Sequence, residues 1–470
     1  MHLKTLASIS FFAAVLVSCS QIQKKPTMSG QPEVLIEGRF AVIPFIGDFK
    51  VHRAQLPNGL KIMILKDRSS PTFAYQTWFN VGSRNEVRGK TGLAHLFEHM
   101  MFKGTSTHPD GQFDALLEQA GVEGENAFTS NDHTVYIQEL PKDGFDLITE
   151  LESDRMVNLI VNDQSFKTER EVVQNERRFR KENSPEGTIY QTLLETAFNE
   201  HPYHWPVIGY EQDLNVMNAK DAREFYELYY SPDRATVVIV GDVDPEAAYR
   251  KIEKLYGGIA PKRSPDAPIA AEPEQTAQRR KRLELNVEVE KLWMAFKVPS
   301  TNSPENPVFE AIQGLLSEGK NGRLNRALVD AGIAASVSSG SFAMKDPGLF
   351  LIEADLQKGK SAVLAETVIL RELERLKTQA VSVEELNRAK NVMRFRFLER
   401  LSTTSGKANF IGQCETALGS IERGIELQNR IYDLTPEQIR ETSTHYFNTS
   451  RMTVVTAVPK AKSSPAKGSL

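Results

Sequence analysis

Residues 234–243 read RATVVIVGDV, and residues 451–458 read RMTVVTAV. The shared letters recur at a constant offset of 217 residues. The same offset relates three residues upstream of each copy, Arg223, Glu224 and Tyr229 in the first and Arg440, Glu441 and Tyr446 in the second. Both copies have the pattern of a helix followed by a strand rich in β-branched residues. The constant offset indicates a duplicated domain of about 200 residues.

The composition is that of an ordinary globular protein. Of the 470 residues, 40% are hydrophobic and 25% are charged, which excludes disordered, collagen-like and multispan membrane classes. Lys plus Arg number 57 against 61 Asp plus Glu, so no basic excess points to nucleic acid as a partner. The two cysteines are too few for a disulfide framework, and we expect Cys414 to be a small buried residue.

Local patterns predict an α+β fold with two homologous domains. Strands are expected at residues 60–65, 73–81, 134–139 and 349–355, and helices at 92–101, 145–157, 164–180 and 361–377. Runs of strands with helices between them favour mostly antiparallel sheets with helices packed on one face. The stretch 261–278 contains four prolines and is interpreted as a linker. It separates a first domain at 37–260 from a second at 279–460, which a tail at 461–470 follows.

The N-terminus predicts a targeting segment. Residues 6–17 form an apolar run that is too short to span a bilayer but suits a signal peptide, assigned to residues 1–18. The run ends in LVSC, which resembles a bacterial lipobox whose cysteine, here Cys19, is lipidated; the alternative is an ordinary signal peptide with a chance cysteine. Residues 19–36 then form a flexible tether. We expect a protein anchored by its lipid in the bacterial cell envelope and facing the periplasm, with Ser20 favouring the outer membrane.

The segment TGLAHLFEHMMFKGT at residues 91–105 contains the most specific chemical motif of the chain. His95 and His99 are four residues apart and project from one helical face, where two imidazoles can share one Zn²⁺ at about 2.0–2.1 Å each. Glu98 can take a proton from a zinc-activated water without being a ligand. This is the H-x-x-E-H pattern. Its apolar surroundings make buried imidazoles costly without a metal or partners.

A catalytic zinc needs a third protein ligand from another element. The helix predicted at residues 166–180 has two glutamates seven residues apart on one face, Glu169 and Glu176. The same helix also fits a solvated charged face, so the residues alone leave the choice of ligand open.

These motifs resemble those of the pitrilysin, insulinase and mitochondrial-processing-peptidase family of zinc metallopeptidases, in a bacterial short-chain form with a lipoprotein signal. The resemblance runs from about residue 52 to about residue 458 and implies that the two domains enclose a cavity. In that family the third ligand is a glutamate about 77 residues beyond the second histidine, which implies a single zinc held by His95, His99 and Glu176. Glu169 occupies the place of a second glutamate that supports catalysis.

The resemblance also covers residues 125–136, ENAFTSNDHTVY, which match the edge strand of the family's active site. It implies that Asn126 and Ala127 bind the backbone of an extended peptide by β-addition; periodicity alone favours a turn and an ordinary strand. His201, Tyr203 and Gly209 match another family landmark, interpreted as structural. The remaining nearby histidines are interpreted as non-ligands: His108, His133 and His204.

The second half departs from the family pattern. Many active members carry an arginine there, followed seven residues later by a tyrosine, and this sequence has Leu328 and Ala335 at those positions. Arg323 and Arg326 lie nearby at the wrong spacing. The departure predicts a heterodimer, in which a homologous chain supplies the missing Arg and Tyr; the alternative is that Arg323, Arg326 or a backbone amide substitutes. The glycine-containing loop at 314–322 matches either a family substrate loop or a simple turn.

Three functions compete. The leading hypothesis is a zinc endopeptidase that cleaves peptides or unfolded segments, with Glu98 as general base. The second is a non-catalytic scaffold subunit of a peptidase-like complex, which the complete set of five site residues argues against. The third is a zinc hydrolase of a non-peptide substrate, which the Asn126-Ala127 strand argues against.

Overall fold

The computed structural model describes residues 34–263, 268–342 and 344–460. The predicted signal peptide, Cys19, most of the tether and the tail therefore lie outside the described residues. Among the helices that are described, none combines the length and the apolar character needed to cross a membrane.

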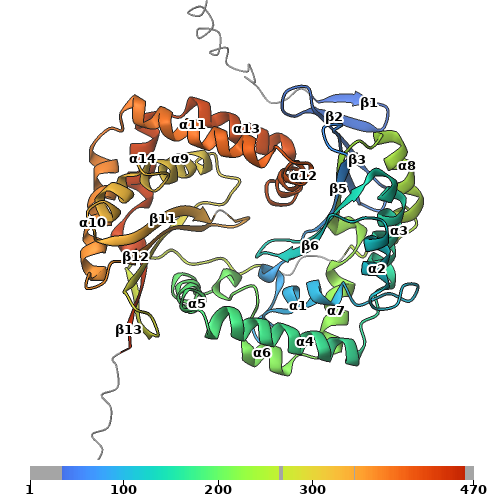
Figure 1. Ribbon diagram of the computed structural model, residues 1–470, viewed down its shortest axis with the longest axis horizontal. Helices are drawn as coiled ribbons and strands as arrows, with labels where there is room; N and C mark the ends of the chain where they lie inside the picture. The colour runs from blue at the N-terminus through green and yellow to red at the C-terminus, as the bar shows by residue number, and fades with distance from the viewer. Residues whose placement is uncertain (1–33, 264–267, 343, 461–470) are drawn as a thin grey trace, which may run out of the picture.

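The first half of the chain builds an eight-stranded sheet in the order β1-β2-β3-β4-β8-β5-β7-β6 (Figure 1). Neighbouring strands are antiparallel except β4 and β8, which are parallel. Strand β6 therefore forms one edge of the sheet. The strands are β1 (Leu35–Glu37), β2 (Phe40–Pro44), β3 (Lys50–Gln55), β4 (Lys61–Lys66), β5 (Thr72–Phe79), β6 (Gly124–Thr129), β7 (Thr134–Pro141) and β8 (Ala235–Gly241).

The second half builds a five-stranded sheet that repeats this topology. Its order, β9-β13-β10-β12-β11, reproduces β4-β8-β5-β7-β6, and the corresponding strands β9 and β13 are the one parallel pair among the described strands of this second sheet. The two segments with repeated sequence are the matching strands β8 and β13, so the predicted duplication is confirmed. The strands are β9 (Arg279–Leu285), β10 (Lys291–Val298), β11 (Ala334–Phe342), β12 (Gly348–Leu356) and β13 (Met452–Pro459).

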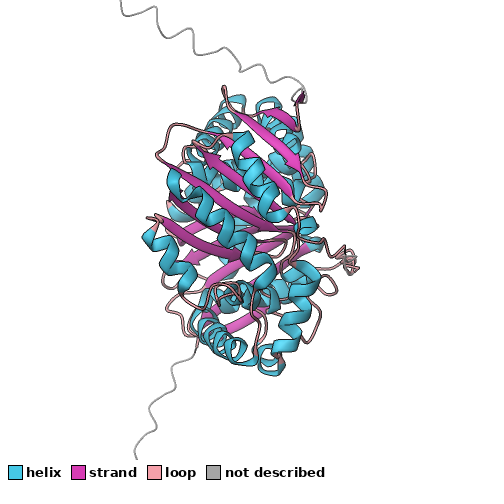
Figure 2. Ribbon diagram, turned by 90° about the vertical axis from the view of Figure 1, so that its right-hand side faces the viewer, coloured by secondary structure: helices cyan, strands magenta, loops and turns pink. Residues whose placement is uncertain are grey.

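Helices cover one face of each sheet, as expected, and Figure 2 shows them lying over the strands. In β8, Val237 and Ile239 point to the helices of the first half, whereas Val238 and Val240 point to the opposite face. The first-half helices are α1 (Leu93–Met100), α2 (Gln112–Gln119), α3 (Phe145–Asn158), α4 (Asp163–Arg177), α5 (Pro185–Ala197), α6 (Glu211–Val216), α7 (Ala219–Tyr229) and α8 (Pro245–Tyr256). The second-half helices are α9 (Asn306–Leu316), α10 (Ala362–Thr378), α11 (Val383–Arg400), α12 (Thr404–Gln413), α13 (Ile421–Asp433) and α14 (Pro436–Tyr446).

The two halves exchange one helix each. Helix α12 of the second half lies against the first sheet (Figure 1) and packs on β5 and β8. Ala408 and Ile411 there join Trp78 in one apolar cluster. Helix α5 of the first half packs on β9, β10 and β13, where Leu193 and Val455 share another cluster. The two helices occupy equivalent places in the duplicated sequence. The second face of each sheet is thus covered by the other half.

The contact between α12 and Trp78 gives a test of this exchange. A Cβ atom on Gly412 would lie 2.1 Å from the Trp78 indole, whereas a Cβ on Gly258 would meet nothing within 4 Å. In an unobstructed helix interior Gly→Ala stabilises by about 1 kcal/mol. We expect Gly412→Ala to lower the free energy of unfolding instead, by about 1–3 kcal/mol, because it overpacks the interface. Thermal or urea unfolding measures the change, with Gly258→Ala as control. A raised melting temperature in Gly412→Ala would contradict the exchange.

Candidate metal centre and active site

The start of α1 is fixed by a close approach of two backbone segments. Gly92 has φ +91° and Gly209 has φ +76°, a region that favours glycine. A Cβ on Gly92 would lie 2.6 Å from Ile208 O, and one on Gly209 would lie 2.2 Å from Thr91 O. Only glycine fits at both positions, which explains the Gly209 landmark in structural terms.

Glu86 caps the N-terminus of α1 and was not identified from the sequence. Its Oε2 accepts a hydrogen bond from Gly92 N at 2.9 Å and its Oε1 accepts one from Ala94 N at 2.7 Å. Burial is the largest influence on the Glu86 pKa and raises it to about 8, while the two N–H groups act in the opposite direction. The cap anchors the helix that carries the histidines.

The structure brings His95, His99 and Glu176 together. One ligand atom from each lies within 4.8 Å of the other two, and these three residues are the one such group among the described residues. Glu176 Oε2 lies 3.4 Å from His99 Nε2, and the other oxygen of the same carboxylate, Oε1, lies 3.8 Å from His95 Nε2. Ligand atoms about 2.0–2.1 Å from a tetrahedral ion lie about 3.3–3.4 Å apart. The first of these distances has this spacing and the second is slightly wider, so the three side chains have the ligand types and the approximate arrangement that a zinc ion requires.

The two histidines differ in charge when no metal is considered. Burial lowers the pKa of His95 to about 4, so its imidazole is neutral at pH 7. Burial also disfavours the charged form of His99, but hydrogen bonds to Glu169 and Glu176 outweigh this and raise its pKa to about 9. Metal binding must therefore displace a proton from His99. His95 Nδ1 is buried and has no hydrogen-bond partner among the described residues.

Glu169 lies on the far side of the His99 ring from Glu176. Its Oε2 is 3.4 Å from His99 Nδ1 and its Oε1 is 2.9 Å from Lys103 Nζ. This arrangement orients a ligating imidazole through its second nitrogen. From the sequence, Glu169 is expected to be a catalytic residue. Its position beside His99 Nδ1 suits a residue that acts by orienting the candidate ligand His99. Lys103 was not identified beforehand, although it lies one turn after His99.

Glu98 projects from α1 toward the edge strand rather than toward α4. Its side chain accepts a hydrogen bond from Thr129 Oγ1 of β6. Burial raises the Glu98 pKa, and the Thr129 hydrogen bond opposes that rise. A carboxyl group with a raised pKa is suited to exchanging protons near neutral pH. The candidate base and the candidate peptide-binding strand are thus in direct contact.

Asn126 and Ala127 lie in the middle of β6. Asn126 is exposed and Ala127 packs partly against the first core. Asn126 Oδ1 accepts a hydrogen bond from Ala127 N at 2.9 Å. Among the described strands β6 pairs with β7 only, so it forms a sheet edge, the kind of position where a further strand can be added.

The other histidines singled out in the sequence have partners away from the metal group. His108 Nδ1 lies 3.0 Å from Asp154, and His204 Nδ1 lies 2.6 Å from Phe198 O. The His133 ring packs against Trp78. Their interpretation as non-ligands agrees with these contacts.

The described residues of the second half contain no counterpart of the metal group. At the offset of 217 residues, His95, Glu98, His99 and Glu176 correspond to apolar residues: Ile312, Leu315, Leu316 and Met393. All four lie in the core of the second half. An apolar core therefore replaces the polar cluster.

The positions aligned with the missing arginine and tyrosine have different environments. Leu328 is fully buried, and Ala335 is exposed on the edge strand β11. Arg323 is held by Glu385 of α11, with hydrogen bonds of 2.8 and 2.7 Å, and Arg326 donates to Asn321 O at 3.0 Å.

Two duplicated α+β halves, with an H-x-x-E-H helix in the first and a carboxylate from α4 as the third candidate ligand, have the architecture of a two-domain zinc peptidase. Residues 61–211 match the family described as insulinase, peptidase family M16, and residues 217–393 match the M16 inactive domain. The chain belongs to peptidase family M16. The candidate zinc ligands all lie within the first match.

Similar proteins and solved structures support this family assignment. The zinc protease PqqE of Helicobacter pylori is 30% identical over 409 residues, 86% of this chain and 92% of that protein. The uncharacterized zinc protease YmxG of Bacillus subtilis is 24% identical and covers 84% of this chain and 96% of its own length. A crystal structure of a protease from H. pylori has a TM-score of 0.83 at 29% identity, covering 87% of this chain and all of that one. An M16 inactive domain from Pseudomonas fluorescens shares the fold at 18% identity, with a TM-score of 0.78 over 88% of this chain and 99% of that one.

The geometry predicts how each glutamate affects zinc retention. Glu176→Gln should lose most of the metal because it replaces a charged ligand by a neutral amide. Glu169→Gln should weaken zinc affinity by about 10–100-fold, because it removes the carboxylate behind His99. Glu98→Gln should retain the metal. Zinc content and competition with a chromophoric chelator measure these effects.

Glu171→Gln is the matched control, since Glu171 is an exposed glutamate on α4, the helix that also carries Glu169 and Glu176. Loss of zinc in Glu98→Gln with full retention in Glu176→Gln would show that the roles are assigned wrongly.

Proposed function

We propose that this chain is a zinc-dependent endopeptidase that hydrolyses peptides or unfolded segments. The observation that carries the proposal is the position of Glu98. Its carboxylate lies on the same helix as two metal ligands and is hydrogen-bonded to the edge strand that would bind the substrate. A scaffold subunit would need neither a complete ligand set nor a buried carboxylate beside it.

Zinc held by His95, His99 and Glu176 would supply a Lewis acid that polarises the scissile carbonyl and lowers the pKa of water. Glu98 would take the proton of the attacking water and return it to the leaving amine. Thr129 holds the Glu98 carboxylate in place, and Glu169 holds the His99 ring. Glu98 is only 9% exposed, so its carboxyl group is largely shielded from bulk water.

The edge strand supports a preference for extended substrates. A peptide added alongside β6 would exchange main-chain hydrogen bonds with it, which suits flexible peptides or unfolded segments rather than folded proteins. The peptide would also compete with the Asn126 side chain for Ala127 N. Backbone binding of this kind gives affinity with little dependence on side chains.

A homologous chain would complete the site. Amide hydrolysis builds negative charge on the carbonyl oxygen, and the loss of one donor to such a charge can cost about 10²–10³ in rate. Leu328 and Ala335 have no side-chain donor, and Arg323 is held by Glu385. We therefore propose a heterodimer in which the second chain supplies Arg and Tyr. A homodimer could not do this, because both copies lack the pair.

Peptidase assays test both proposals. The purified chain should cleave an unstructured peptide slowly, and a homologous chain with the Arg and Tyr should raise the rate by about 10²–10³. Chelation should abolish cleavage and added zinc should restore it. Glu98→Gln should lower kcat by about 10²–10⁴ while keeping zinc, because it removes the base.

Glu171→Gln is again the control. Activity that persists in Glu98→Gln would contradict the assigned base. Full activity of the chain alone, unchanged by a homologue, would contradict the heterodimer. No activity in a zinc-loaded complex would favour the scaffold function.

We further propose that Cys19 is lipidated and anchors the mature protein in the cell envelope, facing the periplasm. One acyl chain anchors only marginally, so stable attachment needs more than one. Mass spectrometry of the mature protein should find an acylated Cys19 at the N-terminus, and Cys19→Ala should leave it soluble or unprocessed. Cleavage elsewhere, with an unmodified Cys19, would refute the proposal.

A further inference from the structure

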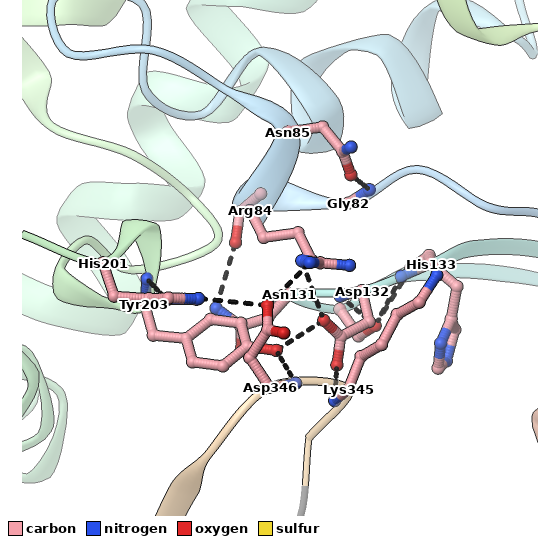
Figure 3. A network of polar contacts seen from close by, with 12 residues as sticks. Gly82, Arg84, Asn85, Asn131, Asp132, His133, His201, Tyr203, Lys345 and Asp346 are labelled. Atoms are coloured by element: carbon pink, nitrogen blue, oxygen red, sulfur yellow. Dashed lines mark hydrogen bonds and ion pairs between the residues drawn. The ribbon is translucent and has the colours of Figure 1, made fainter. Parts of the chain in front are cut away.

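The turn between β6 and β7 is held by residues from both halves (Figure 3). The turn comprises Ser130 to His133, directly after the proposed peptide-binding strand. On one side it contacts residues 82–84, through hydrogen bonds from Ser83 N to Ser130 O and from Arg84 N to Asn131 O. On the other side it contacts Lys345, whose N–H donates to Asp132 and which lies between β11 and β12 in the second half.

Asp132 is the centre of this contact. Its Oδ1 accepts a hydrogen bond from Tyr203 Oη at 2.7 Å, and its Oδ2 accepts one from Lys345 N at 2.9 Å. Arg84 Nε lies 3.6 Å from Oδ1. Asp132 is only 9% exposed, so these protein donors take the place of water around its carboxyl group.

Asp346 extends the network from the second half. Its Oδ2 accepts hydrogen bonds from Arg84 Nη2 at 2.6 Å and from His201 Nε2 at 3.1 Å. The hydrogen-bond pattern assigns the proton to His201 Nε2, because His201 Nδ1 accepts from Tyr203 N at 3.1 Å. Asp346 N donates to Tyr203 Oη at 3.1 Å. The Tyr203 hydroxyl therefore bonds to both halves at once.

This contact gives a role to His201 and Tyr203, which the proposed catalytic site does not use. Both are buried and neither belongs to the metal group. The turn they hold immediately follows Thr129, which bonds Glu98, and lies a few residues from Asn126 and Ala127. A shift of the turn would move the edge strand and the partner of the base together.

We infer that Asp346 of the second half, acting with Tyr203 and Asp132, is a positioning residue for the peptide-binding strand β6. The inference rests on the proposed function in one respect, the use of β6 to bind peptide. The second half, whose described residues include no candidate metal group, thus fixes the shape of the substrate site in the first half. The geometry assigns this task to three residues separated by up to 214 positions in sequence.

Two variants test the inference in the full-length protein. Asp346→Ala removes the acceptor for Arg84 and His201, and Tyr203→Phe removes only the bridging hydroxyl. We expect faster amide hydrogen exchange in residues 124–141, with unchanged zinc content. We also expect each variant to raise KM for an unstructured peptide by about tenfold with kcat within about threefold, and the double variant to be less than additive. Asp346→Asn, which keeps an acceptor for His201, should restore part of the affinity.

Asp330→Ala is the matched control, since Asp330 is an exposed aspartate of the second half. Unchanged exchange in residues 124–141, or an equal increase throughout the protein, would overturn the inference. Binding of a fluorescent peptide to the Glu98→Gln background separates the two proposals. If that protein binds no peptide, peptide binding by β6 fails, and the exchange data still decide whether Asp346 and Tyr203 fix the strand.

Discussion

The structure of the site depends on the burial of ionisable side chains on an apolar helix. His95 and Glu98 are nearly buried, and each needs a partner that α1 cannot provide. Helix α4 supplies Glu176 opposite both imidazoles, and strand β6 supplies Thr129 to Glu98. The positions of α1, α4 and the sheet edge are therefore set by one another. A metal ion with the same three ligands would replace the proton on His99 and leave this arrangement intact.

The two halves show that the same topology can hold either a buried polar cluster or an apolar core at equivalent positions. The second sheet repeats the order of five strands of the first, yet Ile312, Leu316 and Met393 occupy the places of the candidate zinc ligands. An apolar core needs no charged partner from a neighbouring helix. The second half therefore does not need to pair buried charges between its helices. Its loop around Asp346 instead contacts Arg84 and the turn between β6 and β7 in the first half.

Sequence patterns predicted the features that repeat or lie close together along the chain. The 217-residue offset predicted the shared topology, and the spacing of His95 and His99 predicted their common face. Glu176 was separable from Glu169 only through the family resemblance, because both fit one face of a charged helix. The exchange of α5 and α12 has no local signal, since an amphipathic helix shows which face is buried but not which sheet buries it. The contacts of Asp132 with Lys345 and of Tyr203 with Asp346 likewise join segments that are distant in sequence.

The exchanged helices have a consequence for the history of the fold. If an ancestral protein was half as long, two copies that traded the helix equivalent to α5 would have formed a domain-swapped dimer. Fusion of the two genes would keep this exchange within one chain. It would then be seen as the packing of α12 on the first sheet and of α5 on the second. During synthesis, one face of the first sheet must then wait for residues 404–413 before it is covered. Between the completion of the first half near residue 260 and the synthesis of α12, this apolar face would lie exposed, and such transiently exposed surfaces favour aggregation.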